Sequence, residues 1–185
     1  MPATPGSPAY TVGHSNHELD RLVALLAAHG VTRVVDVRRF PGSRRLPHFA
    51  RDELARSLPE RGLDYRHLVD LGGRRRPRPD SPNAGWRVES FRGYADHMAT
   101  PEFHAALSEL EELAAARPSA IMCSEGLWWR CHRRLVSDAL VVRGWEVRHI
   151  APDARVSEHE LTEFAEVHRG ELVYPPVELE LELEV

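Results

Sequence analysis

The chain has 185 residues and a formal net charge of −4; 42% of its residues are hydrophobic and 28% are charged. These proportions are ordinary for a globular protein and allow one substantial core. No apolar run approaches the ~20 residues that cross a bilayer, and residues 1–8 resemble a disordered leader rather than an export signal. With only two cysteines, the sequence predicts a cytoplasmic protein with free thiols and no membrane partner.

The charge is distributed unevenly along the chain. All 24 basic residues are arginine, and residues 38–92 hold 14 of them against 7 acidic residues. Residues 150–185 hold 10 acidic residues and 2 arginines. A basic middle can bind phosphate groups or the acidic end of the same chain. We therefore expect an anionic small molecule or a nucleic acid as partner, with internal pairing as the alternative.

The N-terminal part predicts a βαβ unit. Tyr10–Gly13 has the pattern of a strand, and Ser15 with Glu18 three residues later matches a capping box that opens a helix. Gly30 is placed to end this helix. Val31–Val37 is apolar at nearly every position, which is typical of a buried parallel strand.

The following segments alternate between helical and strand patterns. Helices are expected over residues 50–61, 91–98 and 131–143, and a further helix is expected to open with Thr100 as N-cap and Pro101 as its first residue. Strands are expected over residues 64–68, 119–123 and 145–150. A second capping box, Ser157 to Glu160, predicts a last helix to about His168. This order predicts an α/β fold: a three-layer sandwich with a mostly parallel sheet of about five strands.

Residues 169–185 are expected to extend a single domain that covers residues 9–168. In Val177–Val185 apolar and acidic residues alternate strictly, which is the pattern of a half-buried strand. We expect a C-terminal edge strand that pairs with its own sheet or with the same strand of a second copy. The second case gives a homodimer.

Polar side chains follow the ends of several predicted strands. His14 follows the first strand, Asp36 and Arg38 close the second, and Cys123 with Glu125 follows the fourth. Because the carboxyl ends of parallel strands meet at one edge of the sheet, ligands bind there in open α/β folds. These residues therefore predict a site at that edge, although Asp36 and Arg38 can equally form a structural ion pair.

Two known arrangements do not fit the stretch after the fourth strand. Cysteine phosphatases place five residues between cysteine and arginine, whereas six separate Cys123 from Arg130, and Glu125 would repel a phosphate dianion. Zinc binding by Cys123, Cys131 and His132 is not expected, because adjacent residues at a helix start point about 100° apart. The sequence therefore predicts no metal site and leaves the cofactor unknown.

Several roles in this stretch stay open. Glu125 can be an acid, a base or a nucleophile tuned by nearby cations, or one member of a structural Arg–Glu cluster. Cys123 can be an activated thiolate or an inert buried thiol, and Cys131 is expected to pack in the core. Trp128 and Trp129 cannot both face inward, so one is expected to stack on a ligand, a partner or an arginine.

The motifs TVGHS (residues 11–15), DVRRFPGSR (36–44), LGGRR (71–75), FRGYADHM (91–98) and MCSEGLWWRCHR (122–133) together resemble the domain-of-unknown-function family 488. The resemblance implies an α/β fold but no reaction, because the family has no established activity. It places the signature residues at Gly13, His14, Ser15, Asp36, Arg38, Pro41, Ser43, Arg44, Gly72, Gly73, Arg92, Gly93, Tyr94, Cys123, Glu125, Cys131, His132 and Arg133.

Three functions are compatible with these residues. The first is an enzyme, a hydrolase or a transferase, or a binder that takes a phosphorylated or nucleotide-like ligand. Its candidate catalytic residues are Glu125, His132, Cys123 and His14, and its candidate binding residues are Arg38, Ser43, Arg44, Arg92, Tyr94, Arg133 and Asp36. The second is a nucleic-acid-binding module that uses loops 38–45 and 74–78 with Trp86, Trp128 and Trp129 as stacking surfaces. The third is a structural scaffold.

Overall fold

The computed structural model describes residues 8–42 and 44–176. Its main sheet has the strand order β3-β2-β4-β1-β5-β6, in which the first five strands are parallel and β6 runs antiparallel to β5. The predicted α/β fold with a mostly parallel sheet is confirmed. The strands of this sheet are β1 (Ala9–Gly13), β2 (Arg33–Asp36), β3 (Asp64–His67), β4 (Ser119–Cys123), β5 (Val147–Ile150) and β6 (Val156–Glu158), and a separate antiparallel pair is formed by β7 (Glu166–His168) and β8 (Glu171–Val173).

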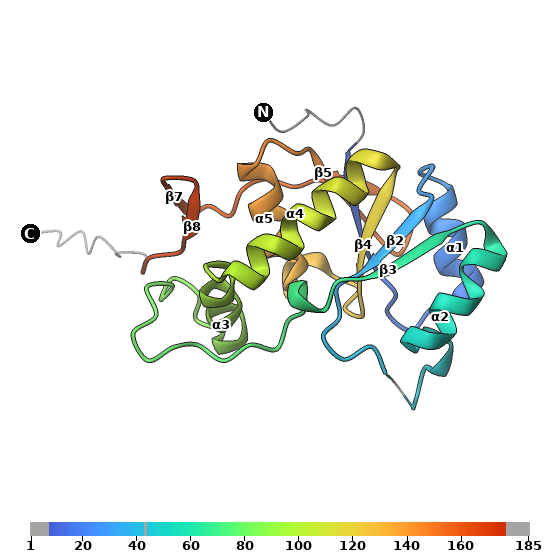
Figure 1. Ribbon diagram of the computed structural model, residues 1–185, viewed down its shortest axis with the longest axis horizontal. Coiled ribbons are helices and arrows are strands. Elements are labelled where there is room, and N and C mark those ends of the chain that lie inside the picture. The colour runs from blue at the N-terminus through green and yellow to red at the C-terminus, as the bar shows by residue number, and fades with distance from the viewer. Residues whose placement is uncertain (1–7, 43, 177–185) are drawn as a thin grey trace, which may run out of the picture.

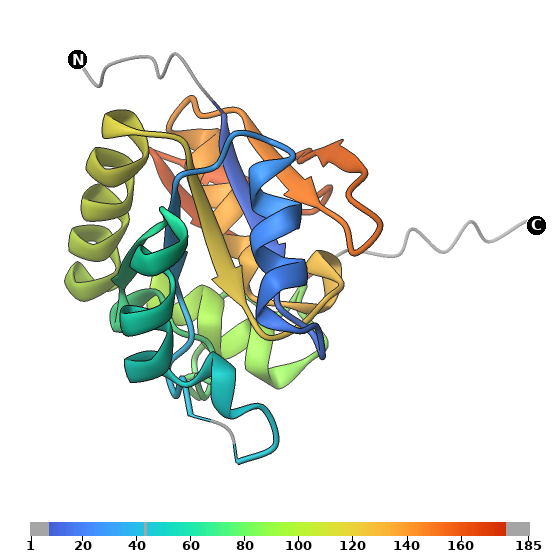
Figure 2. The same cartoon turned by 90° about the vertical axis from the view of Figure 1, so that its right-hand side faces the viewer.

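Helices cover both faces of the sheet (Figure 1). Helices α1 (Leu19–Ala27) and α2 (Arg51–Ser57) pack on one face. Helices α3 (Glu89–Met98), α4 (Pro101–Ala116) and α5 (Arg133–Val142) contribute to the core on the other face. The turned view in Figure 2 shows the sheet between these two layers.

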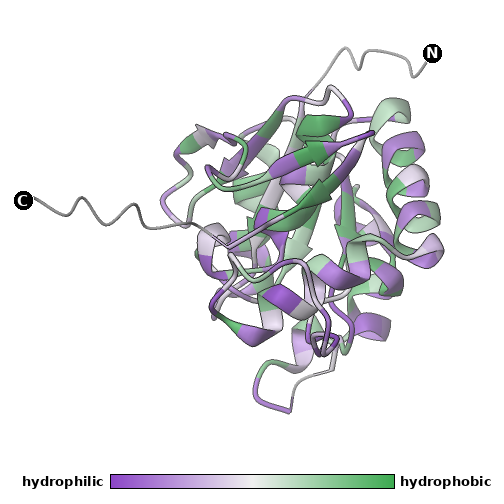
Figure 3. Cartoon of the chain, turned by 90° about the vertical axis from the view of Figure 1, so that its left-hand side faces the viewer, coloured by the Kyte–Doolittle hydropathy of each residue, from purple (hydrophilic) through white to green (hydrophobic). Residues whose placement is uncertain are grey.

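The period of two along each strand produces two cores. Val34 packs with the α1 and α2 side chains, whereas its neighbour Val35 packs with the helices of the other face. Every residue of β1, β2 and β4 is buried, because helices cover both faces of these central parallel strands. Figure 3 shows the hydrophobic residues concentrated on the sheet and on the helix faces that contact it.

Two predicted helix starts are wrong. Helix α1 begins at Leu19 with Glu18 as its N-cap residue and no side-chain cap, and Ser15 has a φ of 50° in the turn before it. The predicted last helix is absent, because Ser157 pairs with His149 in the β5–β6 ladder and the hairpin of β7 and β8 follows. The N-cap at Thr100 is confirmed, since its side chain accepts a hydrogen bond from the Phe103 N–H.

Some predictions fall outside the described residues. These are residues 1–7 of the leader, Ser43, and the whole strand expected over residues 177–185, with the dimer it would form. Among the helices that the structure describes, none combines the length and apolar character needed to cross a membrane.

Candidate functional site at the carboxyl edge of the sheet

A pocket of about 390 Å³ opens at the carboxyl ends of three neighbouring strands. Strand β2 lies between β3 and β4 in the sheet, so the segments that follow these strands meet at one edge. The loop before α3 and the first turn of α3 complete the wall. The lining residues are 38–40, 42, 73–74, 90–91, 123–125 and 130–132.

The loop that carries Glu125 lies directly against β1. The His14 N–H donates to the Cys123 carbonyl oxygen at 2.9 Å, which continues the pairing of β1 and β4 beyond the strands. A Cβ atom at Gly13 would lie 2.0 Å from the Glu125 carbonyl oxygen. Only glycine allows the two backbones to approach this closely, so Gly13 fixes the depth at which Glu125 sits.

Arg133 holds the same loop from α5. Its side chain is 1% exposed, and its guanidinium donates to the carbonyl oxygens of Glu125 and Gly126. It also donates to Cys131 Sγ at 3.5 Å and to Thr11 Oγ1 at 3.4 Å. Arg133 was expected to bind a ligand anion, but it is absent from the pocket lining and its donors are used by the protein. We therefore assign it to positioning the Glu125 loop.

A chain of buried hydrogen bonds continues from Arg133 to Asp138. Since the guanidinium donates to Thr11 Oγ1, the Thr11 hydroxyl can donate to His149 Nδ1 at 2.7 Å. His149 Nε2 then donates to His159 Nδ1 at 2.9 Å, and His159 Nε2 donates to the Asp138 carboxylate at 2.8 Å. In this order the His149 ring carries one hydrogen and is neutral. Burial, followed by the neighbouring His159 and the Arg133 charge, lowers the pKa of His149 to about 2.

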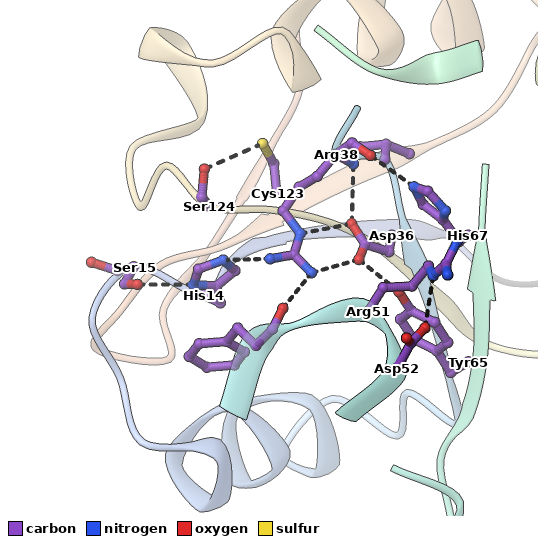
Figure 4. Close-up of polar contacts among 12 residues, drawn as sticks. His14, Ser15, Asp36, Arg38, Arg51, Asp52, Tyr65, His67, Cys123 and Ser124 are labelled. Carbon is purple, nitrogen blue, oxygen red and sulfur yellow. Dashed lines mark hydrogen bonds and ion pairs between the residues drawn. The ribbon is translucent and has the colours of Figure 1, made fainter. Parts of the chain in front are cut away.

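Asp36 and Arg38 form a buried ion pair at the end of β2 (Figure 4). The Asp36 carboxylate accepts from Arg38 Nε at 2.9 Å and Nη2 at 2.6 Å, and from the Tyr65 hydroxyl at 2.8 Å. Arg38 also donates to the Phe49 carbonyl oxygen at 2.8 Å and to His14 Nε2 at 3.2 Å. These bonds match the structural interpretation of the pair, although Arg38 also reaches the pocket wall.

His14 is held as a neutral imidazole. Because Arg38 donates to its Nε2, its Nδ1 carries the hydrogen and donates to the Ser15 carbonyl oxygen at 2.8 Å. The ring stacks on Phe49 with centroids 4.1 Å apart. Burial, followed by the Arg38 charge, lowers the pKa of His14 to about 4. Both ring nitrogens of His14 are hydrogen-bonded to protein atoms, and His14 is not among the pocket-lining residues. This arrangement does not support the predicted catalytic role of His14.

The two buried cysteines shift each other's pKa in opposite directions. A hydrogen bond from the Cys123 thiol, followed by the Arg133 charge, lowers the pKa of Cys131 to about 6 despite its burial. The same hydrogen bond and burial raise the pKa of Cys123 to about 12. The sequence left Cys123 open between an activated thiolate and an inert buried thiol, and its raised pKa agrees with the inert thiol. Cys131 is buried as expected, but its lowered pKa was not anticipated. The missed signal is the position of Cys131 just before a helix N-terminus and two residues from an arginine.

His132 points its Nδ1 at both sulfur atoms, 3.7 Å from Cys131 Sγ and 4.0 Å from Cys123 Sγ. All three atoms lie within 4.8 Å of one another. The expectation that Cys131 and His132 point apart is wrong. Cys131 has extended backbone angles (φ −127°, ψ 150°) and precedes the helix, so the helical rotation of 100° per residue does not apply to the pair.

Glu125 is the only acidic residue among the described residues that line the pocket. Its Oε1 accepts a hydrogen bond from the Leu127 N–H at 3.1 Å. Within residues 8–42 and 44–176 its carboxylate has no ion-pair partner, which removes the support for a structural Arg–Glu cluster. The exposed Arg74 and Arg130 side chains also have no hydrogen-bond or ion-pair partner in this part of the chain.

Residues 18–140 match the family described as Domain of unknown function DUF488. The chain belongs to this family. The match covers every segment that lines the pocket. No curated protein and no solved structure matches the chain.

Three further predicted binding residues of this DUF488 protein, Arg44, Arg92 and Tyr94, are not among the pocket-lining residues. Arg44 is exposed, and Arg92 donates from Nε to the Trp86 carbonyl oxygen at 3.1 Å. Tyr94 is fully buried and donates its hydroxyl to the Leu71 carbonyl oxygen at 2.7 Å. These contacts make Arg92 and Tyr94 structural in the described chain.

The tryptophans are mostly covered. Trp86 is 5% exposed and packs against Tyr174, and Trp128 stacks on His149 with centroids 4.0 Å apart. Trp128 therefore stacks on a histidine, which was not among the expected partners. Trp129 is 48% exposed. Only this last ring is available as the kind of stacking surface that the nucleic-acid interpretation needs.

Sequence reasoning did not single out the aromatic rings of the pocket wall, Phe40 and Phe91, and it used Arg39 and Arg74 only as members of the basic loops of the nucleic-acid hypothesis. Arg39, Phe40 and Arg74 lie on connections that the sequence marks as long, polar and irregular, and Phe91 lies in the first turn of α3. Such length indicates a functional loop, but it does not show which side chains face a common space.

Proposed function

We propose that this DUF488 protein is an enzyme that binds a phosphorylated, nucleotide-like small molecule in the pocket and acts on it through Glu125. One observation carries the proposal. The guanidinium groups of Arg74 and Arg130, which have no hydrogen-bond or ion-pair partner in the described chain, line the same pocket as a single carboxylate, that of Glu125. Arginine suits this task because its planar fork binds phosphate with two parallel hydrogen bonds. The volume of about 390 Å³ is in the range of small-molecule sites.

Aromatic rings in the same pocket favour a nucleotide over inorganic phosphate. Phe40 is 64% exposed, and Phe91 in the first turn of α3 also lines the pocket. The Arg39 guanidinium lies 5.3 Å from the Phe40 ring centroid. Exposed aromatic rings beside arginine bind nucleic bases by stacking and phosphates by charge.

Glu125 is suited to proton transfer. Gly13 and Arg133 fix its backbone, and the Leu127 N–H holds one carboxylate oxygen, so the group is oriented before a ligand arrives. A carboxylate that no protein cation neutralises can take a proton from an attacking hydroxyl or water, or return one to a leaving group. The proposal is therefore a hydrolase or transferase with Glu125 as its general acid–base.

The test is a thermal-shift screen of nucleotides and sugar phosphates, followed by calorimetry on any compound that binds. A ligand present at 100 times its Kd should stabilise the protein by about 2.7 kcal/mol. The double variant Arg74→Ala/Arg130→Ala should then bind at least about tenfold more weakly, because each substitution removes a charge-assisted hydrogen bond.

The matched control is Arg117→Ala, which removes an exposed arginine that follows α4 at the opposite end of β4. It should bind the compound like the unmodified chain. The absence of any stabilising compound, or equal weakening in both variants, would contradict the proposal.

A nucleic-acid interface is the second candidate. It is favoured by the exposed Trp129 and by basic loops 38–45 and 74–78, of which residues 38–40, 42 and 74 line the pocket. The burial of Trp86 and the stacking of Trp128 leave it with fewer stacking surfaces than the sequence suggests.

A further inference from the structure

We propose that Cys123, Cys131 and His132 bind a zinc ion on the inner wall of the pocket. The two Sγ atoms and His132 Nδ1 lie within 4.8 Å of one another. In a tetrahedral site with Zn–S of ~2.3 Å and Zn–N of ~2.0–2.1 Å, neighbouring sulfur and nitrogen ligands are roughly 3.6 Å apart. The observed separations of 3.7 Å and 4.0 Å are close to that value, so little movement is needed to close the site.

A second observation points to a ligand at the same place, namely the orientation of the His132 ring. Its Nε2 donates to the Val37 carbonyl oxygen at 3.1 Å, so the hydrogen resides on Nε2 and the Nδ1 lone pair faces the two sulfurs. A backbone carbonyl that accepts from the distal nitrogen is the usual outer contact of a metal-binding histidine.

Gly73 lets the loop before α3 pack closely against the His132 ring. A Cβ atom there would lie 2.7 Å from His132 Nδ1. Gly73 is not among the residues with positive φ, so backbone conformation does not require a glycine at this position. The close approach of its backbone to the His132 imidazole does require one.

The chemistry of the three donors selects the metal. Two thiolates and one imidazole are soft or borderline ligands that favour zinc over magnesium or calcium, which take oxygen ligands. The buried Arg133 guanidinium donates to Cys131 Sγ at 3.5 Å, which holds this sulfur beside the other two donor atoms. Both cysteines are free and buried.

Three protein ligands leave one tetrahedral position, as in catalytic zinc sites. Cys123, Cys131 and His132 all line the pocket that contains Glu125, so we expect the fourth position to face the space where a ligand would sit. The inference goes beyond the proposed function, because zinc binding requires neither a phosphorylated ligand nor activity.

The experiment uses the full chain, reduced and treated with a chelator, and then titrated with zinc and separately with cobalt(II). We expect about one zinc per chain, and with cobalt the strong visible absorption of a tetrahedral thiolate site. Cys131→Ser and His132→Gln should each weaken zinc binding by at least about 100-fold, more than the ~10–100-fold effect of outer contacts. The matched control is His29→Gln, another half-buried histidine whose Nε2 bonds a backbone carbonyl, and it should bind zinc normally.

If the ligand variants do not fold, the unmodified chain still decides the matter. Zinc should slow alkylation of both cysteines in the folded, reduced protein. A folded, reduced chain that takes up well under one zinc, or whose thiols react equally fast with and without zinc, would overturn the inference. A chain that binds zinc but no phosphate compound supports this site and contradicts the proposed function. A chain that binds a phosphate compound but no zinc supports the proposed function and contradicts this site.

Discussion

The guanidinium of Arg133 donates a hydrogen bond to the backbone carbonyl of Glu125; Glu125 lies in the loop that follows β4, and Arg133 is the first residue of α5. The same guanidinium donates to Cys131 Sγ, and its charge helps to lower the pKa of that thiol. Arg133 therefore couples the fold of the loop to the charge balance of the pocket wall.

The first prediction concerns this coupling. Arg133→Met keeps the side-chain length but removes every donor, and it leaves the buried carbonyl oxygens of Glu125 and Gly126 without this partner. The free energy of unfolding should fall by about 2–4 kcal/mol, because each buried acceptor that loses its hydrogen bond costs about 1–3 kcal/mol. Urea denaturation measures it. Arg117→Met, at an exposed site, should change stability by no more than about 0.5 kcal/mol, and an equal effect in the two variants would contradict the assigned role.

Acid should destabilise the fold through two buried histidines. The pKa values of His14 and His149 are lowered to about 4 and about 2, whereas an unfolded histidine titrates near 6.5. Below about pH 6.5 the unfolded chain binds more protons, so the stability present above that pH is lost as pH falls. The expected slope is up to about 1.4 kcal/mol per pH unit for each histidine.

Denaturation curves between about pH 4.5 and pH 6.5 measure this slope. The variant His149→Gln removes one of the two groups and should reduce the slope by up to about half. The exposed His168 serves as control, and His168→Gln should leave the slope unchanged. A slope that His149→Gln does not alter would show that His149 is not the buried neutral group described above.

Gly13→Ala should damage both stability and the site. The new Cβ would lie 2.0 Å from the Glu125 carbonyl oxygen, a backbone atom that Arg133 also holds. We expect a loss of at least about 3 kcal/mol, at the upper end for overpacking. Gly42→Ala is the matched control, because nothing lies within 4 Å of its Cβ position. Equal stability of the two variants, measured by thermal unfolding, would contradict the close approach of β1 to the Glu125 loop.

The nucleic-acid alternative makes its own forecast. If loops 38–45 and 74–78 track a phosphate backbone, log affinity should fall linearly with log salt, by about 0.7 to 0.9 per phosphate neutralised. The triple substitution Arg74→Ala, Arg75→Ala and Arg76→Ala should flatten that dependence in a filter-binding assay. Since only one tryptophan is exposed for stacking, we expect weak binding at most. Tight binding that depends steeply on salt would favour this alternative over the small-molecule pocket.

The local patterns of the sequence predict most of the fold because they agree with its tertiary structure. The apolar run 31–37 predicts a buried strand, and β2 is buried along its whole length with Val34 and Val35 in different cores. The second capping box fails because tertiary contacts decide that segment. His159 reaches the buried Asp138 carboxylate, and this contact comes with an edge strand rather than a helix.

The site is predicted in position but only partly in composition. Strand ends bring Arg38, Cys123, Glu125 and His132 to one pocket, as parallel topology requires. Arg133 has the same sequence signal as these residues, yet it turns inward to hold backbone carbonyls. Contacts between segments that are distant in the sequence decide which arginines face solvent. The local patterns of a single sequence do not reveal these contacts.

The central claim is that Glu125 is a functional group of an anion-binding pocket and not a structural partner of arginine. The most direct measurement pairs stability and affinity on Glu125→Gln. The amide can still accept from the Leu127 N–H, so the free energy of unfolding should change by no more than about 0.5 kcal/mol. Removing the one carboxylate among the arginines should also strengthen binding of a phosphorylated ligand, by about 3- to 10-fold, because a repulsive charge is lost. A loss of about 3 kcal/mol or more with unchanged affinity would contradict the claim and would make Glu125 part of the scaffold.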